Sequence, residues 1–128
     1  MESIIVTPLK GFNGVHFGML RNEVRKILGN PYREFKKTKF SKNMTDDYVT
    51  YHIYYNAEDQ FEAVEFFDNV TVCDDKGIVF PRKTVDYAAL PYHFENEEES
   101  LICFESEIGV YAPNGTVASI CFGMKGYY

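Results

Sequence analysis

Apolar positions recur along the chain with two different periods, and each period predicts its own kind of element. Between residues 19 and 28 they fall at i, i+4, i+7 and i+8, which is the stripe of an amphipathic helix. These positions are Leu20, Val24, Ile27 and Leu28. Gly29 suits a left-handed C-cap and Pro31 blocks continuation, so the helix is expected to end at Leu28. Residues 32–46 are polar and basic without a sustained period, which predicts a loop or an irregular strand.

Beyond residue 47 the pattern changes to period two, which predicts strands. Residues 48–55 are rich in β-formers, residues 56–59 supply a turn, and residues 60–67 follow as a second strand. The same reasoning predicts further strands at 69–73, 78–80, 101–105, 108–112 and 116–123. Thr84 is placed to N-cap a short helix that Pro91 closes after Leu90.

Two of the predicted hairpins are similar in sequence. Residues 55–66 align with residues 111–122 at a constant offset of 56, and a candidate helix precedes each hairpin. Either the chain contains an internal repeat or two hairpins resemble each other by chance. The repeat predicts a single α+β domain over residues 1–128, with an antiparallel sheet built from two helix–loop–hairpin repeats and the helices on one face. Repeat one would span about 15–80 and repeat two about 81–128.

The first helix carries a resemblance to a known family. The segment Gly18-Met19-Leu20-Arg21-Asn22-Glu23-Val24-Arg25-Lys26-Ile27-Leu28-Gly29-Asn30-Pro31 resembles the G-x-S/T-x-x-x-V-x-x-x-L-G-x-P signature. That signature opens the helix–hairpin unit of proteins similar to β-lactamase inhibitory protein and to the SmpA/OmlA lipoproteins. Leu20 stands where the family has Ser or Thr, and the chain lacks the lipidated N-terminal Cys of the lipoproteins. The resemblance implies a scaffold that grips other proteins, as bacterial immunity proteins do.

Composition fits one domain with a real core and an aromatic surface. The chain has 128 residues, is 45% hydrophobic, and contains ten Tyr and eleven Phe but no Trp. Residues 1–42 hold nine Lys/Arg and three Asp/Glu, for a net charge of +6, and residues 43–128 hold four and sixteen, for −12. Such asymmetry can steer a charged partner, or it can mean only that both segments are solvated. The basic segment at residues 33–42 falls in the first part.

The N-terminal segment, the apolar stretches and the cysteines all indicate a cytoplasmic location. Residues 1–8 lack the basic and apolar regions of a signal peptide, and no apolar stretch approaches the roughly 20 residues that span a bilayer. Cys73, Cys103 and Cys121 are odd in number and lie in apolar contexts, which favours buried free thiols over a disulfide. We therefore expect a cytoplasmic protein without a membrane role.

No sequence motif indicates catalysis, a metal or a cofactor. His16, His52 and His93 are far apart and none has zinc-ligand spacing; the glycines near residue 14 fit no phosphate-binding loop. A triad assembled from distant residues stays open, and it would place His52 or His93 beside a carboxylate or thiol in a cleft. The basic segment with its aromatic residues is compatible with nucleic acid, but a pI near 5.0 argues against that partner. We expect no enzyme activity, no cofactor, no metal and no nucleic acid.

The favoured hypothesis is a protein-binding inhibitor, namely an immunity-type protein that occludes a cytoplasmic toxin with a basic surface. Its predicted contact residues lie in acidic loops and at outward strand positions. They are Asp46, Asp47, Tyr48, Tyr54, Glu58, Asp59, Glu97, Glu98 and Glu99. The alternative is a small-ligand-binding or regulatory module, whose pocket would be lined by Tyr51, Tyr55 and Phe66.

Overall fold

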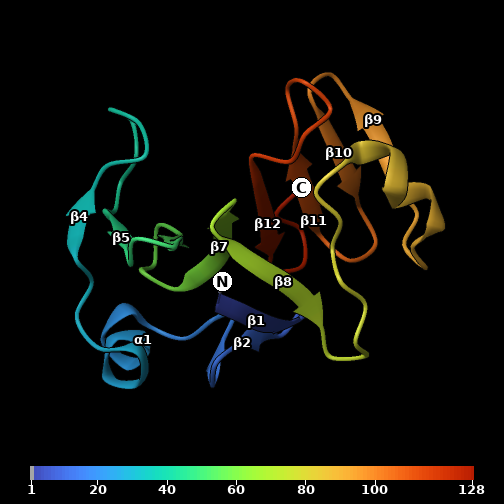
Figure 1. The fold of residues 1–128 in the computed structure, drawn as a ribbon. Helices are drawn as coiled ribbons and strands as arrows, with labels where there is room; N and C mark the ends of the chain where they lie inside the picture. The colour runs from blue at the N-terminus through green and yellow to red at the C-terminus, as the bar shows by residue number, and fades with distance from the viewer. Residues whose placement is uncertain (1) are drawn as a thin grey trace.

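Two stacked β-sheets flanked by two short helices form the fold (Figure 1). The computed structural model describes residues 2–128, with 43% of the chain in strands and 11% in helices. The larger sheet has eight antiparallel strands in the order β4-β5-β6-β7-β12-β11-β10-β9. In that order the strands are Arg33–Phe35, Thr45–Asp47, Tyr51–Tyr55, Phe61–Phe67, Ser119–Gly123, Ile108–Tyr111, Ser100–Cys103 and Glu95–Glu97.

The two predicted hairpins are present and lie side by side at the centre of the large sheet. β6 pairs with β7, β11 pairs with β12, and the hairpins meet where β7 pairs with β12. In the first hairpin the Asn56 side-chain oxygen accepts the backbone N–H groups of Glu58 and Gln60 at 3.0 and 2.9 Å, which fixes the turn. In the second, Gly115 supplies a positive φ of 79°. The similar segments are thus two adjacent hairpins.

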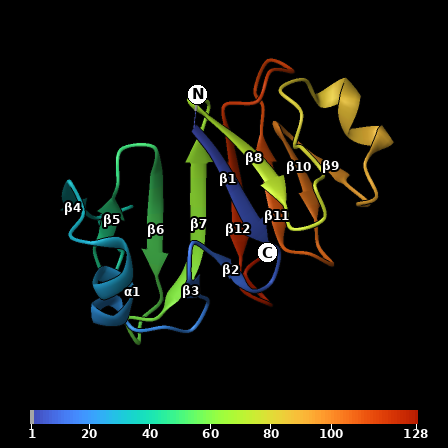
Figure 2. The same cartoon turned by 60° about the horizontal axis from the view of Figure 1, so that its bottom comes forward.

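A smaller sheet covers one face of the large one. Its strands are β1 (Glu2–Thr7), β2 (Gly11–Phe12), β3 (Val15–His16) and β8 (Val70–Asp74), in the order β3-β2-β1-β8. β1 and β8 pair in parallel, and they run across the large sheet in front of β7 and β12 (Figure 2). Because β7 continues directly into β8, the chain itself leads from one layer to the other.

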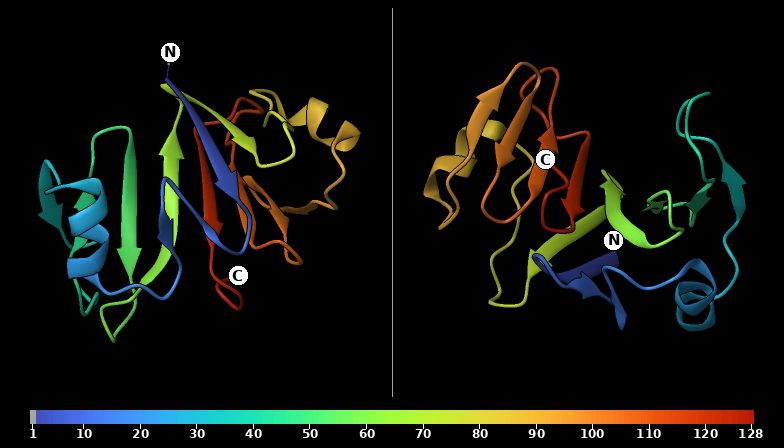
Figure 3. Two further views of the ribbon diagram at one scale, coloured as in Figure 1. Left: turned by 90° about the horizontal axis from the view of Figure 1, so that it is seen from below. Right: turned by 180° about the vertical axis from the view of Figure 1, so that it is seen from behind.

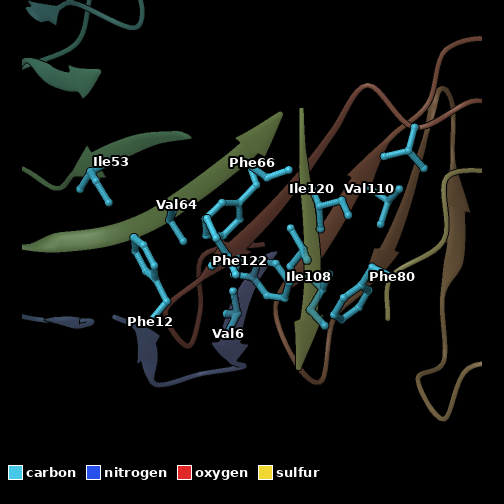
Figure 4. Packing of buried hydrophobic residues seen from close by; sticks show 14 of the residues in the cluster. Val6, Phe12, Ile53, Val64, Phe66, Phe80, Ile108, Val110, Ile120 and Phe122 are labelled. Atoms are coloured by element: carbon cyan, nitrogen blue, oxygen red, sulfur yellow. The ribbon is translucent and has the colours of Figure 1, made fainter. Parts of the chain in front are cut away.

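The core lies between the two layers. The Phe12 ring from the small sheet contacts Tyr51 and Phe66 of the large sheet edge-on, at centroid distances of 5.1 and 5.3 Å. Phe122 extends the cluster from Phe66, at 6.0 Å. The labelled side chains in Figure 4 fill the space between the sheets. Burial of these aromatic rings supplies the hydrophobic driving force for stacking the layers.

The two helices are short and sit at opposite ends of the large sheet. The α-helix α1 (Arg21–Leu28) ends at Gly29, which has the expected positive φ of 88°. At its start the Glu23 carboxylate accepts the Leu20 N–H at 2.9 Å, which is the half of a capping box that does not need Ser or Thr at the N-cap; Leu20 itself supplies no side-chain cap. The second helix, η1 (Thr84–Ala89), is a 3₁₀ helix near β9. Among residues 2–128, no helix is both long and apolar enough to cross a membrane.

The predicted α+β class, with helices on one face of two helix–loop–hairpin repeats, is wrong. The protein is mostly β, with one large eight-stranded antiparallel sheet. A second sheet, rather than a layer of helices, covers the central hairpins. The prediction failed because β1 and β8 are far apart in sequence, and no local period reveals their pairing. Strands β4, β5 and β9 have three residues each, too few for an alternating pattern.

Candidate functional site

The large sheet has one face that the small sheet does not cover, which we call the open face. Side chains of residues in register form rows on it, because alternate residues of a strand point to the same side. The strands follow one another from β4 at one edge of the sheet to β9 at the other (Figure 3), and one row of residues in register crosses all eight of them. In strand order it consists of Arg33, Asp47, His52, Glu65, Cys121, Gly109, Ile102 and Glu95.

Glu65 is the charged residue at the centre of this row. The Tyr54 hydroxyl donates to Glu65 Oε1, and the Ser119 hydroxyl donates to Oε2 at 2.6 Å. Tyr54 is two residues from His52, and Ser119 two residues from Cys121, so both share the open face with Glu65. Within residues 2–128, Glu65 makes no ion pair. A half-buried carboxylate is therefore held in place by two neutral donors.

Two glycines make room for a pair of tyrosines beside Glu65. A Cβ atom on Gly109 would lie 2.1 Å from the Tyr128 Oη, and one on Gly123 would lie 2.5 Å from Tyr127 Cβ. The rings of Tyr127 and Tyr128 therefore lie directly on the backbone of β11 and β12. The Glu107 carboxylate accepts the N–H groups of Gly126 and Tyr128 at 2.5 and 2.9 Å, which fixes the C-terminal residues on the open face.

Lys37, from the loop between β4 and β5, reaches over this region from the other side. Its Nζ lies 4.2 Å from the centroid of the Tyr54 ring and donates to the Tyr127 hydroxyl at 3.2 Å. The resulting cavity, which we call the Glu65 pocket, has a volume of about 270 Å³. It is lined by Lys37, Tyr54, Glu65, Ser100, Ile102, Gly109, Tyr111, Ser119, Cys121, Tyr127 and Tyr128. Lys37 and Tyr54 also line a neighbouring pocket of about 260 Å³, which contains Glu62.

The hydroxyl and thiol groups of the Glu65 pocket are uncharged at neutral pH. Desolvation raises the pKa of Tyr54, and its hydrogen bond to Glu65 raises it further. Desolvation also raises the pKa of Tyr127 and of Tyr128, and it raises the pKa of the Cys121 thiol to about 12. Since the thiolate is the reactive form of cysteine, Cys121 is a poor nucleophile in this setting.

His52 packs between aromatic rings at one side of the open face. Its ring centroid lies 4.6 Å from that of Phe67 and 5.0 Å from that of Phe35, and its Nε2 is 3.5 Å from Asp47 Oδ1. Desolvation lowers the pKa of His52 from its ordinary value. Neither His52 nor Asp47 lines the Glu65 pocket or its neighbour. The separation of 3.5 Å is longer than the roughly 2.6–3.2 Å expected of a catalytic dyad, and the pair lies outside both pockets.

The structure places several predicted contact residues inside the protein. Asp46 has no exposed surface and pairs with Arg21 and Arg25 of α1. Asp47 is buried beside Arg33, with desolvation opposing its ionisation, but a backbone N–H of Val49 and the Arg33 side chain lower its pKa overall. These carboxylates hold the sheet and helix together, so we remove them from the contact surface.

The other predicted residues fall into three groups. Asp59 pairs with Arg21, and the half-buried Tyr48 donates its hydroxyl to the Gly29 carbonyl at 2.7 Å. Tyr54 lines the Glu65 pocket. Glu58 at the hairpin tip and the acidic run Glu97–Glu99 are exposed.

The acidic edge of the sheet is the main exposed charge cluster among the predicted residues. All three residues of β9 are exposed, and Glu98 and Glu99 follow directly. None of these carboxylates is in an ion pair with another residue of the described chain. Tyr111, which is 44% exposed, lies between this edge and the Glu65 pocket. The acidic edge and the pocket are therefore parts of one continuous surface.

The pocket proposed for a small ligand does not form where the sequence suggested. Tyr51 and Phe66 pack against Phe12 in the core, and the Tyr55 hydroxyl donates to Asp46 at 2.9 Å. Sequence reasoning instead missed Glu65, Lys37 and the C-terminal tyrosines. The sequence contained a signal for Glu65, because this charged residue shares a strand face with the apolar residues Ala63 and Phe67. Lys37 and the tyrosines had none, since only the tertiary fold brings them together.

Comparisons with known proteins leave this surface as the main guide to function. Among residues 2–128, no group of three or more His, Cys, Asp or Glu is arranged to hold a metal ion. No protein family matches the chain, and no curated protein or solved structure is significantly similar to it.

Proposed function

We propose that the protein is an immunity-type inhibitor that binds a basic cytoplasmic toxin and occludes it with the open face and the acidic edge. The observation that carries the proposal is the uncovered face of the eight-stranded sheet, with unpaired carboxylates along one border. A toxin that acts on nucleic acid has a surface built for phosphate, and carboxylates complement such a surface. Complementary charge accelerates association and selects the correct partner.

The dimensions of the surface fit a protein partner. Eight strands spaced about 4.8 Å apart span roughly 34 Å, and strands of five residues are about 17 Å long. The open face alone therefore offers roughly 600 Å², against about 800 Å² per partner in a standard interface. The loop 36–43 and the exposed residues Glu98 and Glu99 border the face and add to this area.

A small metabolite bound in the Glu65 pocket is the weaker alternative. The Glu65 pocket is about 270 Å³, which lies below the roughly 300–1,000 Å³ that is typical for small-molecule sites. Polar groups from five strands line it, together with Lys37 and the C-terminal tyrosines. A cavity of this size suits a single side chain of a partner protein better than a whole ligand.

Co-expression with the product of the adjacent gene tests the proposed function. We expect that product to arrest growth when expressed alone and the protein described here to restore growth. Replacing Glu97, Glu98 and Glu99 together by Lys should abolish protection and change the free energy of unfolding by less than about 0.5 kcal/mol, because all three are exposed.

A matched variant separates local charge from total charge. Asp68 and Asp75 are exposed acidic residues away from the open face, so D68K/D75K should still protect. Equal loss of protection in both variants would show that net charge alone is responsible. If the neighbouring product is harmless and does not bind the purified protein, the proposal is wrong.

A further inference from the structure

We propose that the Glu65 pocket is a cage for one organic cation, the ammonium or guanidinium head of a Lys or Arg side chain of the partner, and that Lys37 occupies its entrance in the free protein. The site follows from the geometry of the pocket alone. Only the identification of the cation as part of a partner protein rests on the proposed function.

The charge of the pocket comes from Glu65. Its two oxygens each accept one hydroxyl, from Tyr54 and Ser119, although a carboxylate offers about four acceptor sites. Partly buried charges are normally paired, yet Glu65 forms no ion pair within residues 2–128. The hydroxyls of Tyr54 and Tyr128 and the Cys121 thiol stay neutral, since desolvation raises the pKa of each of these three groups. The pocket therefore has a fixed anion and free acceptor sites for a cationic donor.

The walls of the pocket are aromatic. Tyr127 and Tyr128 stand at 89° to each other with centroids 5.0 Å apart, so they form two perpendicular walls over Gly109 and Gly123. Tyr54 forms a further wall, and Tyr111 lies towards the acidic edge. Rings arranged around a carboxylate are the usual way in which proteins bind organic cations, because ring faces attract positive charge.

Lys37 shows that the cage accepts an ammonium group. Its Nζ lies 4.2 Å from the Tyr54 centroid and 5.9 Å from that of Tyr127, and it is hydrogen-bonded to the Tyr127 hydroxyl. Residues 36–40 of its loop are all exposed, so little packing holds the side chain there. A second cation entering the pocket is repelled by Lys37 and competes for the same rings. Lys37 is thus an internal competitor that the partner displaces.

Titration of the intact ¹⁵N-labelled protein with side-chain analogues tests the cage without any partner. The probes are n-butylguanidinium and n-butylammonium chloride, with neutral n-butylurea as the isosteric control. We expect saturable amide shifts at Gly109, Cys121 and Gly123 with at least one of the two cations and not with the urea. The difference between the two cations tells whether the cage prefers Arg or Lys.

Three variants then test the named residues. Glu65→Gln should weaken binding of the cation by about tenfold, the value of a hydrogen-bonded charge. Lys37→Ala should strengthen it by about threefold, the value of an exposed cation–π contact. Asp75→Asn is the control, because Asp75 is an exposed acid that does not line the Glu65 pocket, and the affinity of this variant should equal that of the wild type.

The outcomes decide each part separately. Equal shifts with butylurea and with the cations in the wild-type protein would overturn the cage, even if E65Q failed to fold. Unchanged affinity in K37A would overturn the role of Lys37. Cation binding without growth protection would leave the cage intact and refute only the immunity function. Growth protection without cation binding would support the immunity function and overturn the cage.

Discussion

Asp46 is predicted to act in stability and not in partner binding, and Asp46→Asn separates the two roles. The side chain has no exposed surface, and it accepts hydrogen bonds from Arg21 Nη1 at 2.8 Å, Arg25 Nε at 2.9 Å and the Tyr55 hydroxyl at 2.9 Å. These contacts join α1 to β5 and β6. Asparagine keeps the shape but removes the charge and turns an NH₂ group towards the guanidinium donors.

The loss of stability expected for Asp46→Asn follows from the environment of the two arginines that Asp46 pairs with. Removing one member of a buried ion pair costs about 3–5 kcal/mol. The side chains of Arg21 and Arg25 remain 14% and 26% exposed, so water partly solvates them once Asp46 is neutral. We therefore expect Asp46→Asn to reduce the free energy of unfolding by about 3 kcal/mol, the lower end of that range. For a domain of this size 1 kcal/mol corresponds to about 4 °C, so Tm should fall by about 12 °C.

Urea unfolding followed by circular dichroism, together with calorimetry, measures this loss. Asp75→Asn is the matched control, because Asp75 is an exposed acid whose neutralisation should change the free energy of unfolding by less than about 0.5 kcal/mol. At a temperature where D46N is still folded, its affinity for the partner should match that of the wild type. A D46N protein as stable as the control would refute the role of Asp46 as the central anchor of α1.

Three further predictions concern the open face. Gly123→Val places a Cβ within 2.5 Å of Tyr127, so the C-terminal residues should leave the open face and the free energy of unfolding should fall by about 1–3 kcal/mol. The NMR signal of Gly109 should then lose the ring-current shift caused by the tyrosine ring. An unchanged shift would contradict the packing. Because desolvation lowers the pKa of His52 from 6.5, the unfolded chain binds the proton more tightly, and the free energy of unfolding should fall as pH drops from about 7.5 to 5.5. This dependence of stability on pH should be weaker in H52Q. An identical dependence in H52Q and in the wild type would refute the role of His52. Since the pKa of Cys121 is raised to about 12, iodoacetamide at about pH 8 should modify Cys73 first, as mass spectrometry of the peptides would show; preferential labelling of Cys121 would count against a neutral thiol.

Local patterns predicted the elements whose side chains meet neighbours in the same hairpin or helix. The apolar stripe of α1 and its end at Gly29 were predicted correctly, as were the hairpins formed by residues 51–67 and 108–123. The six-residue helix at Thr84–Ala89 was predicted in place, but it is a 3₁₀ helix. The small sheet was not predicted, because β1 pairs with β8, a strand that lies far away in the sequence.

The candidate site shows the same limit. Glu65 was visible as a charge on an otherwise apolar strand face, and the acidic residues 97–99 were visible as a run. Asp46 looked like part of an acidic loop, and only the folded protein places it against Arg21 and Arg25. The contact between Lys37 and Tyr127 joins residues that are 90 positions apart in the sequence. The resemblance to β-lactamase inhibitory protein and to the SmpA/OmlA proteins stays a prediction.

Mapping the bound surface tests the central claim most directly. The ¹⁵N-labelled protein would be mixed with the purified product of the adjacent gene, and amide shifts and hydrogen exchange would be followed residue by residue. We predict changes in the row from His52 through Cys121 to Gly109 and along β9, and none in β1 or β2. Changes confined to the small sheet, or no changes with a product that is toxic in cells, would contradict the account.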